Sequence, residues 1–460
     1  MANEMDQMKI LQVNSSDTRG GAAHVAMSLH RAYQSIGHES WLVVGHKLGD
    51  NAHTLPISHD LAGAWWSRPF WRAENMIAQH RFRGAGILRQ MLRMGASPEH
   101  IADWYLGREA FHYPGTSQLL SLPKVAVDVL HLHNMHGDYF DLRQLPHLTT
   151  KLPTIVHLHD AWLLSGHCAF SFDCERWRNG CGQCPDLQIE PAIRRDATAE
   201  NWQRKKIIYT NSRYHIVAPS QWLADKIPDS PLAAGLQSSR VIPNGVNLDI
   251  FQPGNKSDAR KQLALSDTDL IILMVANGIG NNPWKDFRTA RKTFQCLARQ
   301  NPQQEIHVIV IGDNLPDEQY GQVQLRFVPY VENQSTIAQY YKAADLFLST
   351  SRVEVFSTVI SEALACGTPV VATAVGGTPE QISSWNGQDR RKANGILNDA
   401  ADAEGLANSI SFLLKRPQLR HELGQIASER AKMELNMDHQ VEQQLAYYRE
   451  IIRYQEKFDD

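Results

Sequence analysis

Residues 351–380 read SRVEVFSTVISEALACGTPVVATAVGGTPE. The pattern predicts a helix that begins near residues 356–358, directly after Glu354, and that carries Glu362 further along. A Gly-Thr-Pro turn then leads into an apolar run. Because the first N–H groups of a helix lack intrahelical acceptors and carry the positive end of the helix dipole, we expect a phosphate-binding site beside Glu354.

Two carboxylates, Glu354 and Glu362, would flank this site. They would repel a bare phosphate, but they suit a nucleotide sugar, because carboxylates accept hydrogen bonds from the hydroxyls that surround its diphosphate. The alternative interpretation is an ordinary solvated helix that carries two surface glutamates.

The stretch resembles the donor motif of retaining glycosyltransferases of the GT-B fold, especially those of glycosyltransferase family 4. The residues that carry the resemblance are Glu354, Phe356, Glu362, Ala363, Ala365, Gly367, Pro369, Val370, Gly376, Gly377 and Glu380. The resemblance implies an α/β protein with two Rossmann-like domains that face each other across a cleft. Glu354 and the backbone of the following residues would hold the donor sugar and phosphates, and Glu362 the ribose. The donor-binding residues implied here are Phe356, Ser357, Thr358 and Glu362, with Ser357 in place of the family's common glycine.

Composition narrows the class of protein. The chain has 460 residues with 46 basic and 49 acidic side chains, so nucleic acid is not an expected partner. The length indicates two large domains rather than one core. No apolar run approaches the roughly 20 residues that cross a bilayer, and the first ten residues, MANEMDQMKI, lack a signal-peptide pattern. We expect a cytoplasmic protein that touches the inner face of the cell membrane at most peripherally.

Short apolar segments alternate with helical patterns, which indicates doubly wound α/β sheets. The expected strands are residues 9–13, 40–44, 127–132, 154–158, 215–218 and 240–242 in the first domain, and 271–276, 306–311, 346–348 and 370–373 in the second. The expected domains are residues 1–245, with an insert at 53–124 and a cysteine-rich loop at 166–186, and residues 256–436. By resemblance to GT-B proteins, a last helix at 439–457 is expected to join the first domain.

Gly20 and Gly21 lie between the first expected strand and a helix. Glycine lets a ligand approach backbone N–H groups closely, although a Gly-Gly pair is also common in a tight turn. Because a similar loop faces the cleft in family 4 enzymes, the resemblance implies that both glycines contact the donor phosphate or the acceptor.

Two expected strands end in the sequence His-Leu-His. Ligands of open α/β sheets bind beyond the carboxyl ends of the strands, so His133, His136 and His159 are expected to face the cleft, although single histidines at such positions are more often structural. The resemblance places His159 beside the reacting sugar and the segment from His133 to Tyr139, which includes His136, at the acceptor. Asp160 would orient His159 or accept the acceptor's proton.

Four of the six cysteines, Cys168, Cys174, Cys181 and Cys184, lie in one polar loop. The expected reducing compartment disfavours disulfides, and the Cys-x-x-Cys spacing is typical of a zinc knuckle. We favour a structural zinc ion with four thiolate ligands, of which His167 would be able to replace one. Free thiols and disulfides are the alternatives.

The sequence ANGIGNNPWKDFRTA follows the first expected strand of the second domain and places Lys285 at the start of a helix. A lysine there neutralises a diphosphate as it binds and as it departs, and the position matches the lysine of family 4 enzymes. The family's usual arginine a few residues earlier is absent. Asn282 and Arg288 are the nearby residues expected to contact the donor, and a residue of the other domain is the alternative.

The insert interleaves aromatic residues and arginines at residues 65–93. They are Trp65, Trp66, Phe70, Trp71 and Phe82, with Arg68, Arg72, Arg81, Arg83, Arg89 and Arg93. This composition suits peripheral contact with a membrane or a lipid-phosphate acceptor. A helical pair packed on the domain's flank with solvated arginines is an equally consistent interpretation.

These features predict a retaining glycosyltransferase that moves a sugar from a UDP- or GDP-sugar to a glycan or lipid-linked saccharide in cell-surface polysaccharide biosynthesis. Catalysis is assigned to His159, Asp160, Lys285 and Glu354. No cofactor is expected for catalysis, since Lys285 and the helix start would stabilise the leaving diphosphate. A GT-B nucleotide-sugar epimerase and a non-catalytic sugar-binding scaffold are the rival functions.

Overall fold

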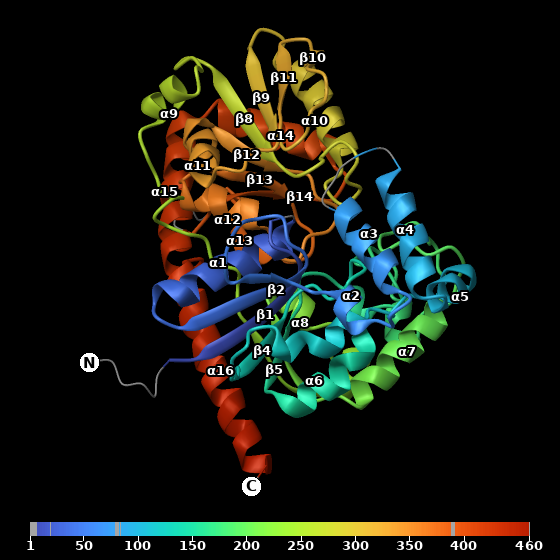
Figure 1. Ribbon diagram of the computed structural model, residues 1–460. Helices are drawn as coiled ribbons and strands as arrows, with labels where there is room; N and C mark the ends of the chain where they lie inside the picture. Colours follow the sequence, from blue (N-terminus) through green and yellow to red (C-terminus); the bar gives the residue numbers. More distant parts are fainter. Residues whose placement is uncertain (1–6, 19, 79–81, 83, 388–391, 460) are drawn as a thin grey trace. The chain divides into compact units, whose positions relative to one another are not determined.

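The computed structural model describes residues 7–18, 20–78, 82, 84–387 and 392–459. The chain divides into two compact units. Unit 1 comprises Met1–Pro219, Leu223–Ile242 and Val441–Asp460, and unit 2 comprises Ser220–Trp222 and Pro243–Gln440. Each unit is built on one sheet flanked by helices (Figure 1), as the alternation of strands and helices in the sequence predicts.

The sheet of unit 1 is parallel throughout, in the order β3-β2-β1-β4-β5-β6-β7. Its strands are β1 (Lys9–Ser16), β2 (Glu39–His46), β3 (Thr54–Pro56), β4 (Val129–Leu132), β5 (Thr154–His157), β6 (Tyr214–Ala218) and β7 (Leu236–Val241). The residues of β4, β5 and β6 are buried along their whole length, which is why these strands appear in the sequence as continuous apolar runs rather than as alternating patterns.

Helices cover this sheet and extend it. They are α1 (Gly21–Ser35), α2 (His59–Ala62), α3 (Arg68–Ala78), α4 (Ala85–Ala96), α5 (Glu99–Leu106), α6 (Leu145–Lys151), α7 (Thr198–Thr210), α8 (Gln221–Ala224), whose first two residues belong to unit 2, and α16 (Met437–Asp459). From Val441 onward α16 belongs to unit 1, where the Tyr448 hydroxyl lies 2.5 Å from His131 Nδ1 and 3.1 Å from the Tyr33 hydroxyl. These polar contacts are buried, so α16 both covers the sheet and is held on it by hydrogen bonds.

The insert forms α2 to α5, and α3 and α4 lie side by side (Figure 1) around a small core of Trp71, Ala96 and Tyr113. Buried Glu74 accepts hydrogen bonds from both Arg89 and Arg93, and its Oε1 lies 2.7 Å from Arg93 Nη2. These two arginines therefore turn inward, and the expectation that the arginines of this segment are solvated is wrong for them. Arg81 and Arg83 lie outside the described residues.

The sheet of unit 2 has the order β10-β11-β9-β8-β12-β13-β14, parallel except for the edge strand β10. Its strands are β8 (Leu270–Val275), β9 (Ile306–Ile311), β10 (Glu318–Tyr320), β11 (Val323–Val328), β12 (Leu346–Ser349), β13 (Val370–Thr373) and β14 (Gly395–Asn398). Its helices are α9 (Lys256–Gln262), α10 (Phe287–Gln300), α11 (Gln334–Ala343), α12 (Thr358–Ala365), α13 (Thr378–Gln381), α14 (Ala403–Leu414) and α15 (Pro417–Glu434).

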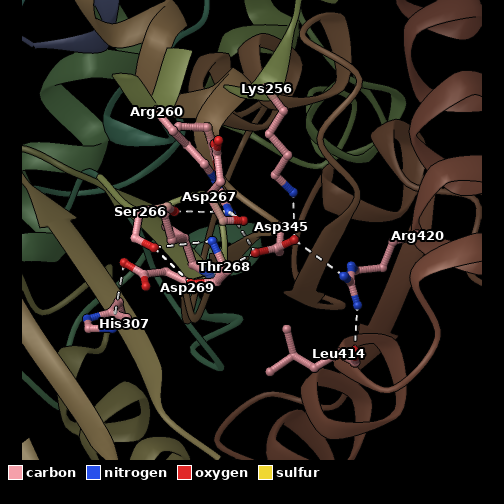
Figure 2. Close-up of polar contacts among 12 residues, drawn as sticks. Lys256, Arg260, Ser266, Asp267, Thr268, Asp269, His307, Asp345, Leu414 and Arg420 are labelled. Atoms are coloured by element: carbon pink, nitrogen blue, oxygen red, sulfur yellow. Dashed lines mark hydrogen bonds and ion pairs between the residues drawn. The ribbon is translucent and has the colours of Figure 1, made fainter. Parts of the chain in front are cut away.

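A buried carboxylate, Asp345, interacts with several residues at the amino-terminal ends of the unit 2 strands (Figure 2). Its oxygens lie 2.6 Å from Lys256 Nζ, 3.0 Å from Arg260 Nη2 and 3.3 Å from Arg420 Nη2. One oxygen also accepts the N–H of Ile271 in β8 at 2.8 Å. The cluster thus joins α9, α15 and two strands. Asp267 of the nearby Asp-Thr-Asp sequence is an exposed turn residue.

Three short strands, β3, β10 and β14, and the six-residue strand β11 were not among the strands expected from the sequence. β3, β10 and β14 lie at sheet edges, where a strand has no neighbouring strand on one side. Their runs of apolar residues are too short to stand out in the sequence. Among the described residues, no helix is long and apolar enough to cross a membrane.

Candidate functional site

In an open α/β sheet, ligands bind beyond the carboxyl ends of the strands at the point where the strand order reverses. In unit 1 that point lies between β1 and β4, and in unit 2 between β8 and β12. The loop after β1 carries Gly20, and His133 follows β4 directly. The loops after β8 and β12 carry Lys285 and Glu354. Most of the predicted site residues therefore lie at the two reversal points.

In unit 2, Lys285 and Glu354 are in direct contact. Lys285 Nζ lies 2.5 Å from Glu354 Oε2, and the side chains are 27% and 14% exposed. This is a charge-assisted hydrogen bond between partly exposed side chains. The carboxylate balances the charge of the ammonium group, which stays accessible to a competing anion.

Backbone contacts hold the two loops together. Thr350 Oγ1 donates to the carbonyl of Lys285 at 2.9 Å, and the N–H of Arg352 donates to the carbonyl of Trp284 at 2.8 Å. Asp286 caps α10 by accepting the N–H of Thr289 at 3.1 Å. The position of Lys285 next to Glu354 is therefore fixed by the fold and not by the ion pair alone.

The start of α12 has no side-chain cap among the described residues, since the hydroxyl of the N-cap residue Ser357 makes no capping bond. Instead Gln381 holds the backbone of Ser357, with Oε1 accepting its N–H at 2.9 Å and Nε2 donating to its carbonyl at 2.8 Å. Phe356 and Ser357 are buried, whereas Thr358 and Val359 are half-buried. The helix start is thus suited to bind an anion through its backbone rather than through these side chains.

The glycine pair that follows β13 packs against this loop. The N–H of Gly377 donates to the Glu354 carbonyl at 2.9 Å, and a Cβ atom on Gly376 would lie 1.8 Å from the same oxygen. Gly376 also has a φ of +56°. A side chain at Gly376 would therefore displace the backbone of Glu354.

Glu362 lies in the second turn of α12 and is 8% exposed. Its Oε2 accepts a hydrogen bond from the Tyr341 hydroxyl at 3.0 Å. Burial raises the pKa of Glu362 to about 7, although the bond from Tyr341 opposes the shift. Partial burial raises the pKa of Tyr330, and the charges of Glu332 and Glu362 add to the shift, so Tyr330 lies near this carboxyl group.

The two residues expected to replace the family's arginine differ in placement. Asn282 Oδ1 accepts the N–H of Trp284 at 3.0 Å, so this side chain folds back on its own turn. Arg288 is exposed on the first turn of α10 and forms no ion pair with the residues that the structure describes. Of the two, Arg288 is the side chain that remains accessible to a ligand.

In unit 1, Gly20 is the N-cap of α1 and has a φ of +89°, a conformation that favours glycine. A Cβ atom at Gly20 or Gly21 would meet no atom within 4 Å. The helix therefore begins at an open position with no side-chain cap from the described residues.

A chain of hydrogen bonds fixes the ring of His159. Gln12 Oε1 lies 3.0 Å from His133 Nε2, and His133 Nδ1 lies 2.9 Å from His159 Nε2. Since the Gln12 oxygen only accepts, His133 carries its proton on Nε2, and its Nδ1 accepts the proton of His159 Nε2. His159 Nδ1 is then left with its lone pair. Burial lowers the pKa of His159 to about 4, with Asp160 raising it and His136 lowering it, so the ring is neutral near pH 7.

This arrangement changes the expected roles of three residues. Asp160 does not orient His159: its Oδ2 lies 2.7 Å from His136 Nε2, and its Oδ1 accepts the N–H of Trp162. Burial opposes ionisation of Asp160, but the His136 charge and these hydrogen bonds dominate and lower its pKa. Tyr139, expected at the acceptor, is buried, and its hydroxyl donates to the carbonyl of Asn134 at 2.5 Å. His133, also expected at the acceptor, is buried behind His159.

His131, His133 and His157 form the one group among the described residues whose potential metal ligand atoms all lie within 4.8 Å of one another. Five of their six ring nitrogens form hydrogen bonds: His131 Nε2 lies 3.2 Å from His157 Nδ1, His131 Nδ1 bonds Tyr448, and both nitrogens of His133 are bonded. His157 Nε2 is buried without a partner among the described residues. The rings of His131 and His157 stack at an interplanar angle of 6°. Burial lowers the pKa of all three well below the ordinary value. A ladder of neutral, hydrogen-bonded rings therefore accounts for all of these nitrogens except His157 Nε2.

Sequence reasoning missed the residues that support the site. Gln12 in β1 sets the tautomer of His159, Tyr341 in α11 contacts Glu362, and Gln381 in α13 holds the start of α12. Each is far from its partner in the sequence and belongs to no local motif. The one signal available in the sequence was a polar residue within an expected apolar strand, where burial requires a hydrogen-bond partner, and this signal applies to Gln12 alone.

Comparison with known proteins agrees with the geometry. Residues 255–430, which include Lys285, Glu354 and Glu362, match the family model described as "Glycosyl transferases group 1". A candidate colanic acid biosynthesis glycosyl transferase of Escherichia coli K12, WcaC, is 23% identical over 407 residues, which are 83% of this chain and 87% of that protein.

Two further likenesses concern part of the chain and the fold. The D-inositol 3-phosphate glycosyltransferase of Actinosynnema mirum is 31% identical over 198 residues, which are 40% of this chain and 45% of that protein. The structure of sucrose-phosphate synthase from Thermosynechococcus elongatus superposes with a TM-score of 0.63 at 19% identity, over 97% of this chain and 100% of that one. The last comparison shows the fold.

Proposed function

Because the chain is a group 1 glycosyltransferase of the GT-B fold that uses a nucleotide sugar, as its sequence motif predicts, we propose that it is a retaining enzyme. It transfers the sugar of a UDP- or GDP-sugar to a glycan or lipid-linked saccharide. The observation that carries this proposal is the contact of Lys285 with Glu354 beside the uncapped start of α12. An ammonium group, free helical N–H groups and a carboxylate in adjacent loops match the diphosphate and the hydroxyls of such a donor.

Donor binding exchanges the partners of Lys285. A diphosphate carries more negative charge than one carboxylate, so it competes with Glu354 for the ammonium group. Glu354 is then available to accept hydrogen bonds from sugar hydroxyls. As the sugar–phosphate bond breaks, Lys285 and the N–H groups of α12 stabilise the growing charge on the leaving nucleoside diphosphate.

Glu362 and Tyr341 hold the ribose in this proposal. A ribose hydroxyl donates to the ionised carboxylate of Glu362, whose other bond comes from Tyr341. Tyr330, which is exposed and near Glu362, is placed to stack on the base.

His159 contributes a lone pair and not a proton. Because the Gln12–His133 chain places the His159 proton on Nε2, its Nδ1 accepts a hydrogen bond from a hydroxyl of the donor sugar. The acceptor hydroxyl forms a bond to the anomeric carbon on the face that the diphosphate leaves, and its proton passes to a departing phosphate oxygen. Configuration is therefore retained. His136 and Asp160 lie next to each other and bind the acceptor.

The acceptor belongs to cell-surface polysaccharide biosynthesis in this proposal, which rests on the relationship to WcaC. A glycosyltransferase acting there meets lipid-linked intermediates at the membrane. An epimerase or a non-catalytic scaffold fits the comparisons less well, because the family model describes transferases.

The insert supplies a membrane contact for this acceptor. Trp65 is 80% exposed, and Phe70, Ile87 and Met91 on α3 and α4 are exposed as well. Arg68 at the start of α3 is exposed as well. Exposed apolar side chains accompanied by cationic ones bind an anionic lipid surface peripherally. Trp65→Ala is expected to reduce sedimentation with phosphatidylglycerol vesicles, whereas Tyr454→Ala, an exposed aromatic residue on α16, is not.

The test of the proposed function is nucleotide release that depends on added acceptor. The protein is incubated with UDP- and GDP-sugars and a lipid-linked saccharide, and the anomeric configuration of the product is read by proton NMR. We expect acceptor-dependent release and the donor's own configuration in the product. Glu354→Gln is expected to abolish transfer, while Glu404→Gln, an exposed glutamate on α14, leaves it unchanged. Release that ignores the acceptor, or an inverted product, would refute the proposal.

A further inference from the structure

The cysteine-rich segment is a long loop with little regular structure. Residues 165–197 connect the 3-10 helix at Trp162–Leu164 to α7, and within them the structure describes one short 3-10 helix, Arg176–Asn179. A loop longer than about 15 residues is uncommon in a compact domain unless something ties it down. Its fully buried apolar side chains are few, namely Ala169, Trp177, Ile193 and Ala197. Apolar burial alone is a weak source of order for such a segment.

The Cys-x-x-Cys sequence forms a tight left-handed turn. Gly180, Cys181, Gly182 and Gln183 have φ values of +100°, +59°, +86° and +48°. For the two non-glycine residues, Cys181 and Gln183, this conformation costs about 1–2 kcal/mol each. Strain of this kind persists only where other interactions compensate for it.

The turn packs against the beginning of the same loop. The N–H of Gly166 donates to Cys181 Sγ at 3.3 Å, and Cys184 Sγ lies 3.4 Å from His167 Nε2. Cys168 is the next residue in the chain. The contacts therefore bring His167 and the two turn cysteines together and place a third cysteine beside them.

His167 has the orientation of a metal ligand. It is 1% exposed, and its Nδ1 lies 3.0 Å from the carbonyl oxygen of Pro191. A carbonyl only accepts, so Nδ1 carries the proton and the lone pair of Nε2 points toward Cys184. Histidine ligands of zinc are commonly oriented by such a bond from their other nitrogen.

We propose that this cluster binds one structural Zn²⁺ ion through Cys181, Cys184 and His167, with the fourth ligand supplied by Cys168 or Cys174. Zinc–sulfur and zinc–nitrogen bonds of about 2.3 and 2.0 Å at a tetrahedral angle put two such ligand atoms about 3.5 Å apart. The observed separation of 3.4 Å between His167 Nε2 and Cys184 Sγ matches this value. No three of these ligand atoms lie within 4.8 Å of one another among the described residues, so the ion would draw the other two thiolates, that of Cys181 and that of the fourth ligand, toward the pair of His167 and Cys184.

The ion would stabilise more than the loop. The N–H groups of Gly182 and Cys184 donate to Thr198 Oγ1 and Asp196 Oδ2, at 2.9 and 2.7 Å, where α7 begins. Lys205 of α7 donates to the carbonyls of Trp162 and Ser165 at 2.9 and 3.1 Å. The N–H of Trp162 in turn bonds Asp160. The zinc site thus connects through a few bonds to the pair of Asp160 and His136.

Metal content tests the proposal directly and does not depend on transferase activity, so failure of the proposed function would leave this test intact. The full chain is purified without chelator, and zinc and iron are measured by mass spectrometry. We expect about one zinc per chain and no iron. A strong zinc chelator is expected to lower the thermal midpoint, and added zinc chloride to restore it. Protein that contains no zinc after reconstitution with zinc chloride, or that contains iron, would overturn the proposal.

Variants identify the ligands. Cys184→Ser and His167→Ala are expected to lose most of the zinc, whereas Cys296→Ser, a half-buried cysteine on α10, retains it. Equal zinc content in Cys184→Ser would refute the assignment. Thiol titration of the denatured, chelated wild-type protein provides a measurement without mutation. All six cysteines should react, and a count of four or two would indicate disulfides in place of a metal site.

Discussion

Replacing Glu362 by glutamine tests the buried carboxyl group of unit 2. The folded protein holds the Glu362 proton up to a pH of about 7, whereas the unfolded chain releases it near 4.5. Between these values the folded state binds more protons, so the free energy of unfolding falls as pH rises. The difference of about 2.5 in pKa corresponds to about 3 kcal/mol, lost progressively from pH 4.5 to 7. Glu362→Gln keeps the shape without the charge and should remove this loss.

The assay is urea denaturation at pH 5 and pH 8, with the difference between variant and wild type compared at each pH. We expect Glu362→Gln to be similar to wild type at pH 5 and about 2–3 kcal/mol more stable at pH 8. Tyr341→Phe serves as the matched variant, because it removes the hydrogen bond that favours the ionised carboxylate and should deepen the loss. If the difference between Glu362→Gln and wild type is the same at both pH values, Glu362 does not titrate in this range and the reasoning is wrong.

The raised pKa of Glu362 also predicts how donor affinity depends on pH. A ribose hydroxyl donates to the ionised form, so below pH 7 donor binding must first remove the proton. Affinity for a UDP-sugar is expected to weaken about tenfold per pH unit below that point, and to show no such trend in Glu362→Gln. Three other predictions are independent of Glu362. Asp345→Asn should destabilise the protein by about 3 kcal/mol in urea, because Arg260, only 4% exposed, loses its buried partner, whereas Asp267→Asn in an exposed turn should cost under about 0.5 kcal/mol. Gln12→Leu should allow both neutral tautomers of His159, seen in its ¹⁵N shifts; one unchanged tautomer would contradict the chain of hydrogen bonds. Gly376→Ala should lower transfer by displacing Glu354, whereas Gly37→Ala, with a φ of +93° but open space, should cost only backbone strain; unimpaired transfer by Gly376→Ala would show that the loop adapts.

The fold was largely predictable because its parallel strands are buried on both faces and stand out as apolar runs between helical patterns. The strands around residues 9–13 and 306–311 illustrate this, since the structure places β1 and β9 there. β14 was missed because Gly395–Asn398 is a short edge segment whose last residues are not fully buried.

The candidate site was predictable where a motif is local. Glu354, Lys285 and the start of α12 follow directly from strand ends and helix starts. The partners of His159 were not, because Gln12 and His133 meet it through sheet register, which one sequence does not specify. The prediction that Tyr139 is accessible was wrong for a related reason. A tyrosine that follows a strand is commonly accessible, but Tyr139 is buried against Gly45 of a different strand, β2, and this contact is not visible in the sequence.

Equilibrium donor binding shows whether Lys285 holds the diphosphate. Titration calorimetry with a panel of UDP-, GDP- and ADP-sugars identifies the nucleotide, and the same donor is then titrated into Lys285→Ala and into Lys292→Ala, an exposed lysine on α10. A charged hydrogen bond of about 1.5–3 kcal/mol predicts a loss of affinity of roughly 10- to 100-fold in Lys285→Ala and none in Lys292→Ala. Equal affinity in Lys285→Ala and wild type would contradict the account.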